Sequence, residues 1–210
     1  MFHKIKYFIR SKLLPNSLFL IDKPKNPKKV YLTFDDGPVP EVTLPLLKLL
    51  DKYQVKATFF VIGNLVKKHP EIVKKIHQSG HKVANHTYTH PRFNKISMTQ
   101  KLKEIVDTNT LIEEITNEKC QMFRAPQGRW DLKLLFRLFK LKITAIHWNR
   151  DSMDFLKESA DKVISRFEYQ PVKSGDILLF HDDNSLCIEV LDKLIPKWIS
   201  QGYKLTALEL

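Results

Sequence analysis

The sequence Val-Tyr-Leu-Thr-Phe-Asp-Asp-Gly-Pro at residues 30–38 decides the fold of this 210-residue chain. Its first five residues, rich in β-branched and aromatic types, predict a buried strand. Asp35 and Asp36 follow, and Gly37-Pro38 predicts a turn that breaks strand alternation, so that both carboxylates can face one cavity. Two close carboxylates need a cation if both stay ionised. The simpler alternative is a solvated surface turn.

Six further apolar runs of this kind alternate with helical patterns along the chain. The expected strands are Val30–Phe34, Ala57–Ile62, Lys82–Asn85, Gln121–Arg124, Ile143–Trp148, Asp176–His181 and Tyr203–Leu208. The expected helices are Leu44–Tyr53, Pro70–Gln78, a long helix to Thr116 behind a Ser97/Gln100 capping box, Leu132–Phe139, Ala160–Phe167 and Ile188–Ser200. Pro196 is expected to kink or shorten the last of these. Strict alternation predicts an α/β domain over 30–210 with parallel strands, either an open doubly wound sheet or a barrel.

Composition narrows the class of protein. Hydrophobic residues make up 43% of the chain and charged residues 28%, which excludes a disordered protein. No run approaches the ~18 apolar residues of a transmembrane helix, and Leu18–Ile21 is too short for a signal-peptide core. We therefore expect a cytoplasmic location, with peripheral membrane contact as the alternative. Cys120 and Cys187 have no CxxC partner and are expected to be free thiols.

Residues 1–29 form a separate basic segment in this interpretation. They hold eight Lys/Arg and one acid, a net +7 of the chain's +12. Such a segment attracts anionic membranes, nucleic acids or acidic glycans, or simply aids solubility. Without regular basic–aromatic alternation we expect no specific nucleic-acid partner. Apolar residues spaced along one side of this segment predict a helix that lies on a membrane or, as we favour, packs over the domain; they are Phe2, Ile5, Phe8, Ile9 and Leu13. No pattern sets the oligomeric state.

Polar clusters follow the ends of five expected strands, the edge that carries active sites in barrels and open α/β sheets. After Lys82–Asn85 come His86 and His90, which can converge on one metal; two histidines and a carboxylate form a catalytic zinc pattern. Ordinary surface or core histidines are the alternative. His77 and His81 have no matching partner and are expected to be bystanders.

The remaining clusters follow the fourth, fifth and sixth expected strands, and Asp151 and Asp154 are the cluster that follows the fifth. Arg124, if buried, must find an anion, and Asp35 or Asp36 is the obvious partner. The turn after it, through Gln127, could present backbone N–H groups to an oxyanion. His181 is either a satisfied core residue or a catalytic acid. Bulky aromatic side chains near these clusters could be core residues or sugar-stacking walls; they are Trp130, Trp148 and Phe155.

Together these residues resemble the polysaccharide deacetylase family, the NodB-homology or carbohydrate esterase family 4 enzymes, over roughly residues 30–208. The matching segments, in the family's order and spacing, are Thr33–Pro38 (TFDDGP), His86–His90 (HTYTH), Arg124–Gly128 (RAPQG), Asp151–Phe155 (DSMDF) and Leu178–His181 (LLFH). Gln127 stands where the family usually has an aromatic residue, and Phe155 where it usually has Trp. Both differences change the expected groove wall.

The resemblance implies a distorted, TIM-like (β/α) barrel of about seven strands. It implies a divalent metal, usually Zn²⁺, held by Asp36, His86 and His90, and an N-acetylated sugar polymer or oligomer as substrate. The implied catalytic residues are Asp35 as general base, Arg124 orienting it, His181 as general acid, and Asp151 or Asp154 in support. Residues expected to contact the substrate are Gln127, Trp148, Phe155 and Leu178. The alternatives are an O-acetyl esterase, a hydrolase of another non-peptide amide, a non-catalytic carbohydrate-binding relative, or a basic membrane-surface or nucleic-acid protein.

Overall fold

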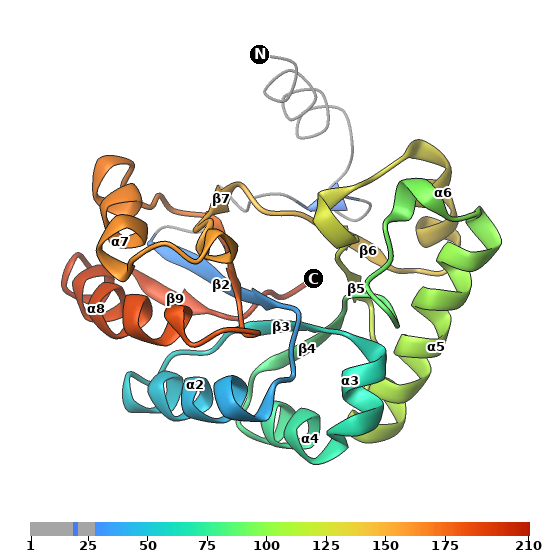
Figure 1. The fold of residues 1–210 in the computed structure, drawn as a ribbon, viewed down its shortest axis with the longest axis horizontal. Helices are drawn as coiled ribbons and strands as arrows, with labels where there is room; N and C mark the ends of the chain where they lie inside the picture. The colour runs from blue at the N-terminus through green and yellow to red at the C-terminus, as the bar shows by residue number, and fades with distance from the viewer. Residues whose placement is uncertain (1–18, 21–27) are drawn as a thin grey trace.

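One all-parallel sheet organises the part of the chain that the computed structural model describes, residues 19–20 and 28–210 (Figure 1). Across it the strands run in the order β1-β6-β5-β4-β3-β2-β8-β7, and β9 also pairs with β2. The strands are β1 (Phe19–Leu20), β2 (Lys29–Asp35), β3 (Thr58–Val61), β4 (Lys82–Asn85), β5 (Met122–Phe123), β6 (Thr144–Ile146), β7 (Arg150–Asp151), β8 (Ile177–His181) and β9 (Lys204–Thr206). The sheet curls into a distorted barrel that is open between β1 and β7, as the family resemblance implied.

Strand β2 pairs with three other strands of this sheet. It pairs with β8 along Tyr31–Asp35, with β3 along Thr33–Asp35 and with β9 along Lys29–Tyr31. The seven strands expected from the sequence are all present, and β1 and β7 are two-residue additions too short to leave a periodic signal. The rest of the basic segment, residues 1–18 and 21–27, and the helix expected there lie outside the described residues.

Helices and single turns of 3₁₀ helix surround the sheet (Figure 1). The helices are α2 (Pro40–Lys52), α3 (Gly63–Lys68), α4 (Pro70–Gln78), α5 (Met98–Thr116), α6 (Leu132–Lys140), α7 (Ala160–Tyr169) and α8 (Leu186–Ser200), and the 3₁₀ turns are η1 (Phe93–Lys95), η2 (Pro126–Gly128) and η3 (Asp154–Leu156). The Ser97/Gln100 capping box at the start of α5 is confirmed. Helix α8 continues through Pro196 to Ser200, so the proline does not shorten it.

Strand alternation divides the side chains of β2 between two layers. Phe34 points into the layer under the helices, where it stacks on Phe59 with ring centroids 5.0 Å apart. Tyr31, on the other face, belongs to a smaller cluster inside the barrel with Phe60. Asp35 shares that inner face, because it lies an even number of residues from Tyr31. The fold thus directs the first carboxylate into the mouth of the barrel.

The described residues also test two predictions from composition. Cys120 and Cys187 are free and buried, as expected. Among residues 19–20 and 28–210, no helix has the length and apolar character needed to cross a membrane.

Candidate active site

Asp35 and Arg124 form a buried ion pair at the carboxyl ends of β2 and β5. The Arg124 guanidinium donates to Asp35 Oδ1 at 2.7 Å and to the Thr33 hydroxyl at 2.8 Å. Its flat group lies 4.0 Å from the ring centroid of Phe60. Burial raises the pKa of Asp35, but the positive charges of Arg124, His86 and His181 outweigh it, and the pKa lies below its ordinary value. Of the two partners predicted for Arg124, Asp35 is therefore the one that it binds, and Asp35 is held as a carboxylate.

Asp36, His86 and His90 converge beside this pair. Asp36 Oδ1 lies 3.4 Å from His86 Nε2 and 3.5 Å from His90 Nε2. One ligand atom from each residue lies within 4.8 Å of the other two. Separations near 3.4 Å are the edge lengths of a tetrahedron whose ligand bonds are about 2.1 Å, the usual zinc–ligand distance. The convergence predicted from the sequence is confirmed.

The chemistry of these three groups fits a divalent cation. Asp36 Oδ1 is buried and receives no hydrogen bond from any described residue, and an unsatisfied buried carboxylate oxygen is costly without a counter-charge. Burial, together with the charge of His86, lowers the pKa of His90, which favours the neutral ring that a metal ligand needs. The site is consistent with a divalent metal held by one carboxylate and two imidazoles.

Hydrogen bonds fix the first histidine in the required tautomer. His86 Nδ1 lies 2.9 Å from the carbonyl oxygen of Arg124. Because a carbonyl can only accept, Nδ1 carries the proton and the lone pair of Nε2 faces Asp36. The backbone of Arg124 thus orients a metal ligand while its side chain holds Asp35.

A second set of contacts holds the loop between the two histidines. Glu104, on α5, accepts hydrogen bonds from the backbone N–H groups of Tyr88 and Thr89 at 2.9 and 2.7 Å and from the Thr89 hydroxyl at 2.9 Å. Thr87 and His90 have left-handed backbone conformations, with φ of 74° and 54°. Non-glycine residues keep this conformation only when their surroundings enforce it. Glu104 lies 14 residues beyond the motif that it holds, so no local sequence pattern marks it as part of the site.

His181 and Asp154 form the opposite side of the site. The parallel register of β2 and β8 places His181 beside Asp35. His181 Nδ1 lies 2.6 Å from Asp154 Oδ1, and the His181 backbone N–H donates to Asp154 Oδ2 at 2.9 Å. Asp154 is fully buried. Of the two acids left open by the sequence, Asp154 is therefore the one that contacts His181.

Asp151 has a different place in the same cavity. Its carboxylate accepts from the Trp148 indole at 3.2 Å and from the Met153 backbone N–H at 2.8 Å. Burial raises its pKa, against the effect of these hydrogen bonds. Asp151 thus fixes the orientation of Trp148 and the turn that leads to Asp154.

The cavity has a volume of about 370 Å³ and combines these charged groups with an apolar wall. Its lining residues are Asp35, Asp36, His86, His90, Gln127, Trp148, Asp151, Phe155, Leu179 and His181. Phe155 is 53% exposed and lies edge-on to the His181 ring at 5.8 Å. Gln127 has a left-handed backbone, with φ of 56°. Both residues that depart from the family pattern lie on the wall.

One expected substrate contact is wrong. Leu178 is completely buried in the main hydrophobic core, and its neighbour Leu179 lines the cavity. Successive side chains on a strand face opposite sides, so the residue two before His181 shares its face. That alternation was the signal that could have identified Leu179.

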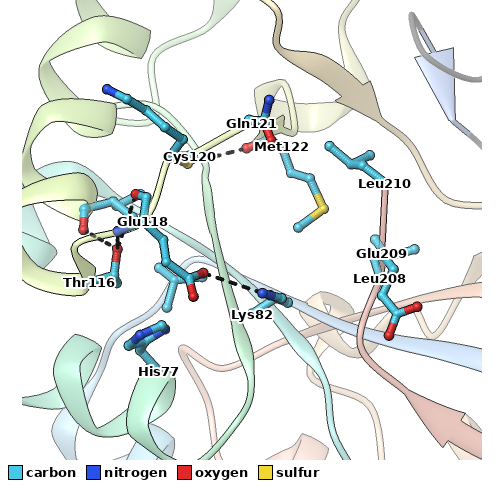
Figure 2. Close-up of a pocket in the computed structure, with 13 residues that line it drawn as sticks. His77, Lys82, Thr116, Glu118, Cys120, Gln121, Met122, Leu208, Glu209 and Leu210 are labelled. Atoms are coloured by element: carbon cyan, nitrogen blue, oxygen red, sulfur yellow. Dashed lines mark hydrogen bonds and ion pairs between the residues drawn. The ribbon is translucent and has the colours of Figure 1, made fainter.

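A larger cavity, of about 440 Å³, lies at the amino-terminal ends of β4 and β5 (Figure 2). Its charged residues include Lys82 and Glu118, which form an ion pair with each other at 3.4 Å. Among the described residues, the cluster that could hold a metal ion, Asp36, His86 and His90, lies at the carboxyl ends of the strands. The smaller cavity is therefore the candidate active site.

A parallel barrel with a carboxylate–bis-histidine cluster, a buried Asp–Arg pair and an Asp–His pair at one end is the architecture of the polysaccharide deacetylase class of hydrolases. Sequence comparison agrees: the family profile described as "Polysaccharide deacetylase" matches residues 22–146. The chain belongs to this family, also known as carbohydrate esterase family 4.

Individual relatives support the same assignment. The chain is 35% identical to a chitooligosaccharide deacetylase of Bradyrhizobium sp. (strain ANU 289), across 74% of this chain and 71% of the relative. It is 32% identical to a peptidoglycan-N-acetylglucosamine deacetylase of Bacillus cereus, across 93% of each.

Solved structures resemble the fold closely. The Bc1960 peptidoglycan N-acetylglucosamine deacetylase superposes with a TM-score of 0.87 at 30% identity and covers 91% of both chains. A carbohydrate esterase family 4 pseudoenzyme of Bacillus anthracis superposes with a TM-score of 0.85 at 31% identity, over 93% of this chain and 68% of the other. Since the same fold occurs in a pseudoenzyme, the fold alone does not establish catalysis, and the residues of the site decide it.

Proposed function

We propose that this protein is a zinc-dependent deacetylase that removes N-acetyl groups from an oligomer or polymer of N-acetylated amino sugars. One observation carries the proposal: the buried Asp35–Arg124 pair lies between the Asp36/His86/His90 cluster and the His181–Asp154 pair. The relatives named as chitooligosaccharide and peptidoglycan deacetylases support the substrate class.

Each side chain has a role that follows from its environment. A divalent cation at Asp36, His86 and His90 supplies a Lewis acid for amide hydrolysis. Asp35, kept ionised by Arg124, takes the proton of the attacking water. His181, whose ring Asp154 holds through Nδ1, donates a proton from Nε2 to the departing amine, because an unprotonated amine is a poor leaving group. The backbone N–H of Gln127 supplies an oxyanion donor, a kind of contact worth about 3 kcal/mol.

The cavity wall supports a sugar rather than a small acyl compound as the bound group. Trp148 and the exposed ring of Phe155 offer apolar faces beside the polar cluster. Sugar rings pack their C–H faces on such aromatic surfaces while their hydroxyls bind polar groups nearby. The wall is compatible with both N-acetyl and O-acetyl groups, so a test must offer both.

The first experiment measures acetate release from chitooligosaccharides, peptidoglycan fragments and O-acetylated sugars, before and after treatment with a chelator. We expect release from the N-acetylated sugars, its loss with the chelator and its return when Zn²⁺ is added. Faster release from O-acetylated sugars would establish an esterase instead. Glycan binding without acetate release at saturating Zn²⁺ would establish a non-catalytic carbohydrate-binding protein.

The second experiment isolates the proposed general base. Asp35→Asn keeps the shape of the side chain but removes the proton acceptor, and we expect it to retain zinc while turnover falls about 10²–10⁴-fold. Asp161→Asn, on the exposed surface of α7, is the matched control and should behave as the wild type. Unchanged turnover in Asp35→Asn would remove this residue from the chemistry.

A further inference from the structure

Helix α6 carries two parallel rows of side chains outside the active site. Leu132, Phe136 and Phe139 are spaced i, i+4 and i+7, which places them on one face of the helix. Lys133, Arg137 and Lys140 repeat the same spacing one residue later, so a basic row borders the apolar row. Lys140 Nζ lies 4.7 Å from the ring centroid of Phe136, so the two rows are in contact.

The apolar row is not part of the core. Leu132, Phe136 and Phe139 are 76%, 55% and 59% exposed. The helix already buries a third face against the domain, formed by Leu134, Leu135 and Leu138. Figure 1 places α6 at the periphery of the fold. Three large apolar side chains in one row on a helix that is already packed mark a surface that binds something.

The charge around this apolar row indicates the chemistry of the partner that binds it. Residues 129–142 contain five Lys/Arg, all exposed, and one acid, Asp131, which is paired with Lys101. An apolar row bordered by cations is the pattern of helices that lie in the interface of an anionic bilayer. Rings and leucine side chains enter the acyl boundary while the neighbouring cations contact lipid phosphates.

Residues 1–18 of the same chain are the competing occupant, and their charge argues against it. They contain four Lys/Arg and no Asp or Glu, so they would bring positive charge onto a positive surface. They are considered because the chain enters the described part of the fold beside β6, the strand that follows α6. Phe19 pairs in parallel with Ala145 on β6, so the segment joins the domain at the end of β6 that is reached from the last turn of α6.

We propose that the Leu132/Phe136/Phe139 face of α6 is a peripheral membrane-binding surface for anionic phospholipid. The surface lies outside the catalytic cavity, so the proposal stands independently of the reaction. In this proposal the protein is a peripheral membrane protein, and its attachment to the bilayer needs both the apolar row and the basic row.

Flotation of the full chain with vesicles tests this surface. We expect binding to vesicles of phosphatidylcholine with phosphatidylglycerol, little binding to phosphatidylcholine alone, and weaker binding as salt rises. The double variant Phe136→Ser/Phe139→Ser should lower the partition coefficient at least about tenfold, since two apolar rings no longer enter the bilayer. Lys133→Gln/Arg137→Gln should lower it about 30-fold, because two cations that attract the anionic surface are lost.

Controls separate this result from its alternatives. Tyr169→Ser removes an 86% exposed ring on α7 and should leave vesicle binding unchanged. Unaltered circular dichroism melting of each variant shows that the fold is intact. Absence of vesicle binding by the wild type would overturn the proposal. Equal vesicle binding by the wild type and the Phe136→Ser/Phe139→Ser variant would overturn it too, and this is the result expected if residues 1–18 are the occupant of the α6 face. If the wild type is a dimer, the Phe136→Ser/Phe139→Ser variant is a monomer and vesicle binding is unchanged, the face binds a second copy of the chain. That outcome would also overturn the proposal.

Discussion

His181 Nδ1 lies 2.6 Å from the buried Oδ1 of Asp154, and the other oxygen of that carboxylate accepts from the His181 backbone N–H. Burial lowers the pKa of the ring, but the hydrogen bond and charge of Asp154, helped by Asp35 and Asp36, raise it to about 9. His181 therefore carries its proton at neutral pH, the state that a general acid must have before the amine departs.

Asp154→Asn tests this coupling through the pH dependence of turnover. In the wild type, kcat/KM should fall as pH rises through about 9, because His181 then loses its proton. Asparagine can keep a hydrogen bond to the ring but carries no charge, so the pKa of His181 drops and the alkaline limb moves to lower pH. Profiles of the two proteins that superimpose would show that Asp154 does not set the state of His181.

Removing a single metal ligand should empty the cluster. His86→Ala deletes the ligand whose Nε2 lies 3.4 Å from Asp36 Oδ1, and a site left with one carboxylate and one imidazole binds zinc weakly. Elemental analysis after dialysis should find one zinc per chain in the wild type and almost none in the variant. His77→Ala, outside the cluster, is the control. Full zinc occupancy in His86→Ala would mean that the ligand set is misassigned.

Glu104 should affect metal affinity without touching the metal. Glu104→Ala removes the acceptor that holds Tyr88 and Thr89, between the two histidine ligands. Supporting groups of this kind typically change metal affinity 10–100-fold, and we expect a loss of that size in a competition titration with a chelating dye. Glu114→Ala, exposed on the same helix, should bind zinc as the wild type does. An unchanged dissociation constant in Glu104→Ala would show that the loop holds its shape alone.

Much of this site could be predicted from the sequence because its motifs follow apolar runs. Seven such runs predicted the strands, and parallel pairing brings the residues after them, such as Asp36 and His86, to one end. The features that the sequence did not predict depend on which way a side chain faces and on contacts between residues far apart in the chain. Leu178 and Leu179 are both apolar, and only the alternation of β8 counted from His181 identifies Leu179 as the residue that lines the cavity. Glu104 carries no local pattern, and only the packing of α5 brings it to the histidine loop.

Short elements escaped prediction for a different reason. Helix α3 has six residues and β7 has two, too few to show the period of a helix or a strand. The left-handed backbone of Asp36, with φ of 78°, likewise leaves no periodic trace. Such features follow from tertiary contacts that compensate for their local cost.

His81, expected to be a bystander, supports the fold in its neutral form. Its Nδ1 accepts a hydrogen bond from the Ala57 backbone N–H at 3.1 Å, and its ring lies edge-on to Phe59 at 5.5 Å. Burial, with a smaller effect from the charge of Lys56, lowers its pKa from 6.5 to about 4. Since the unfolded chain binds this proton more readily, the contribution of His81 to stability is complete above pH 6.5 and is lost as the pH falls toward 4.

His81→Asn makes that contribution measurable. Asparagine can accept from Ala57 through its side-chain oxygen but does not titrate, so the variant should lose less stability on acidification than the wild type does. Urea unfolding at about pH 7 and about pH 4 gives both free energies, and the drop should be smaller in His81→Asn by up to about 3 kcal/mol. Groups that titrate in both proteins cancel in this difference. Equal drops would show that His81 is protonated without cost in the folded state, because the Ala57 contact then rearranges.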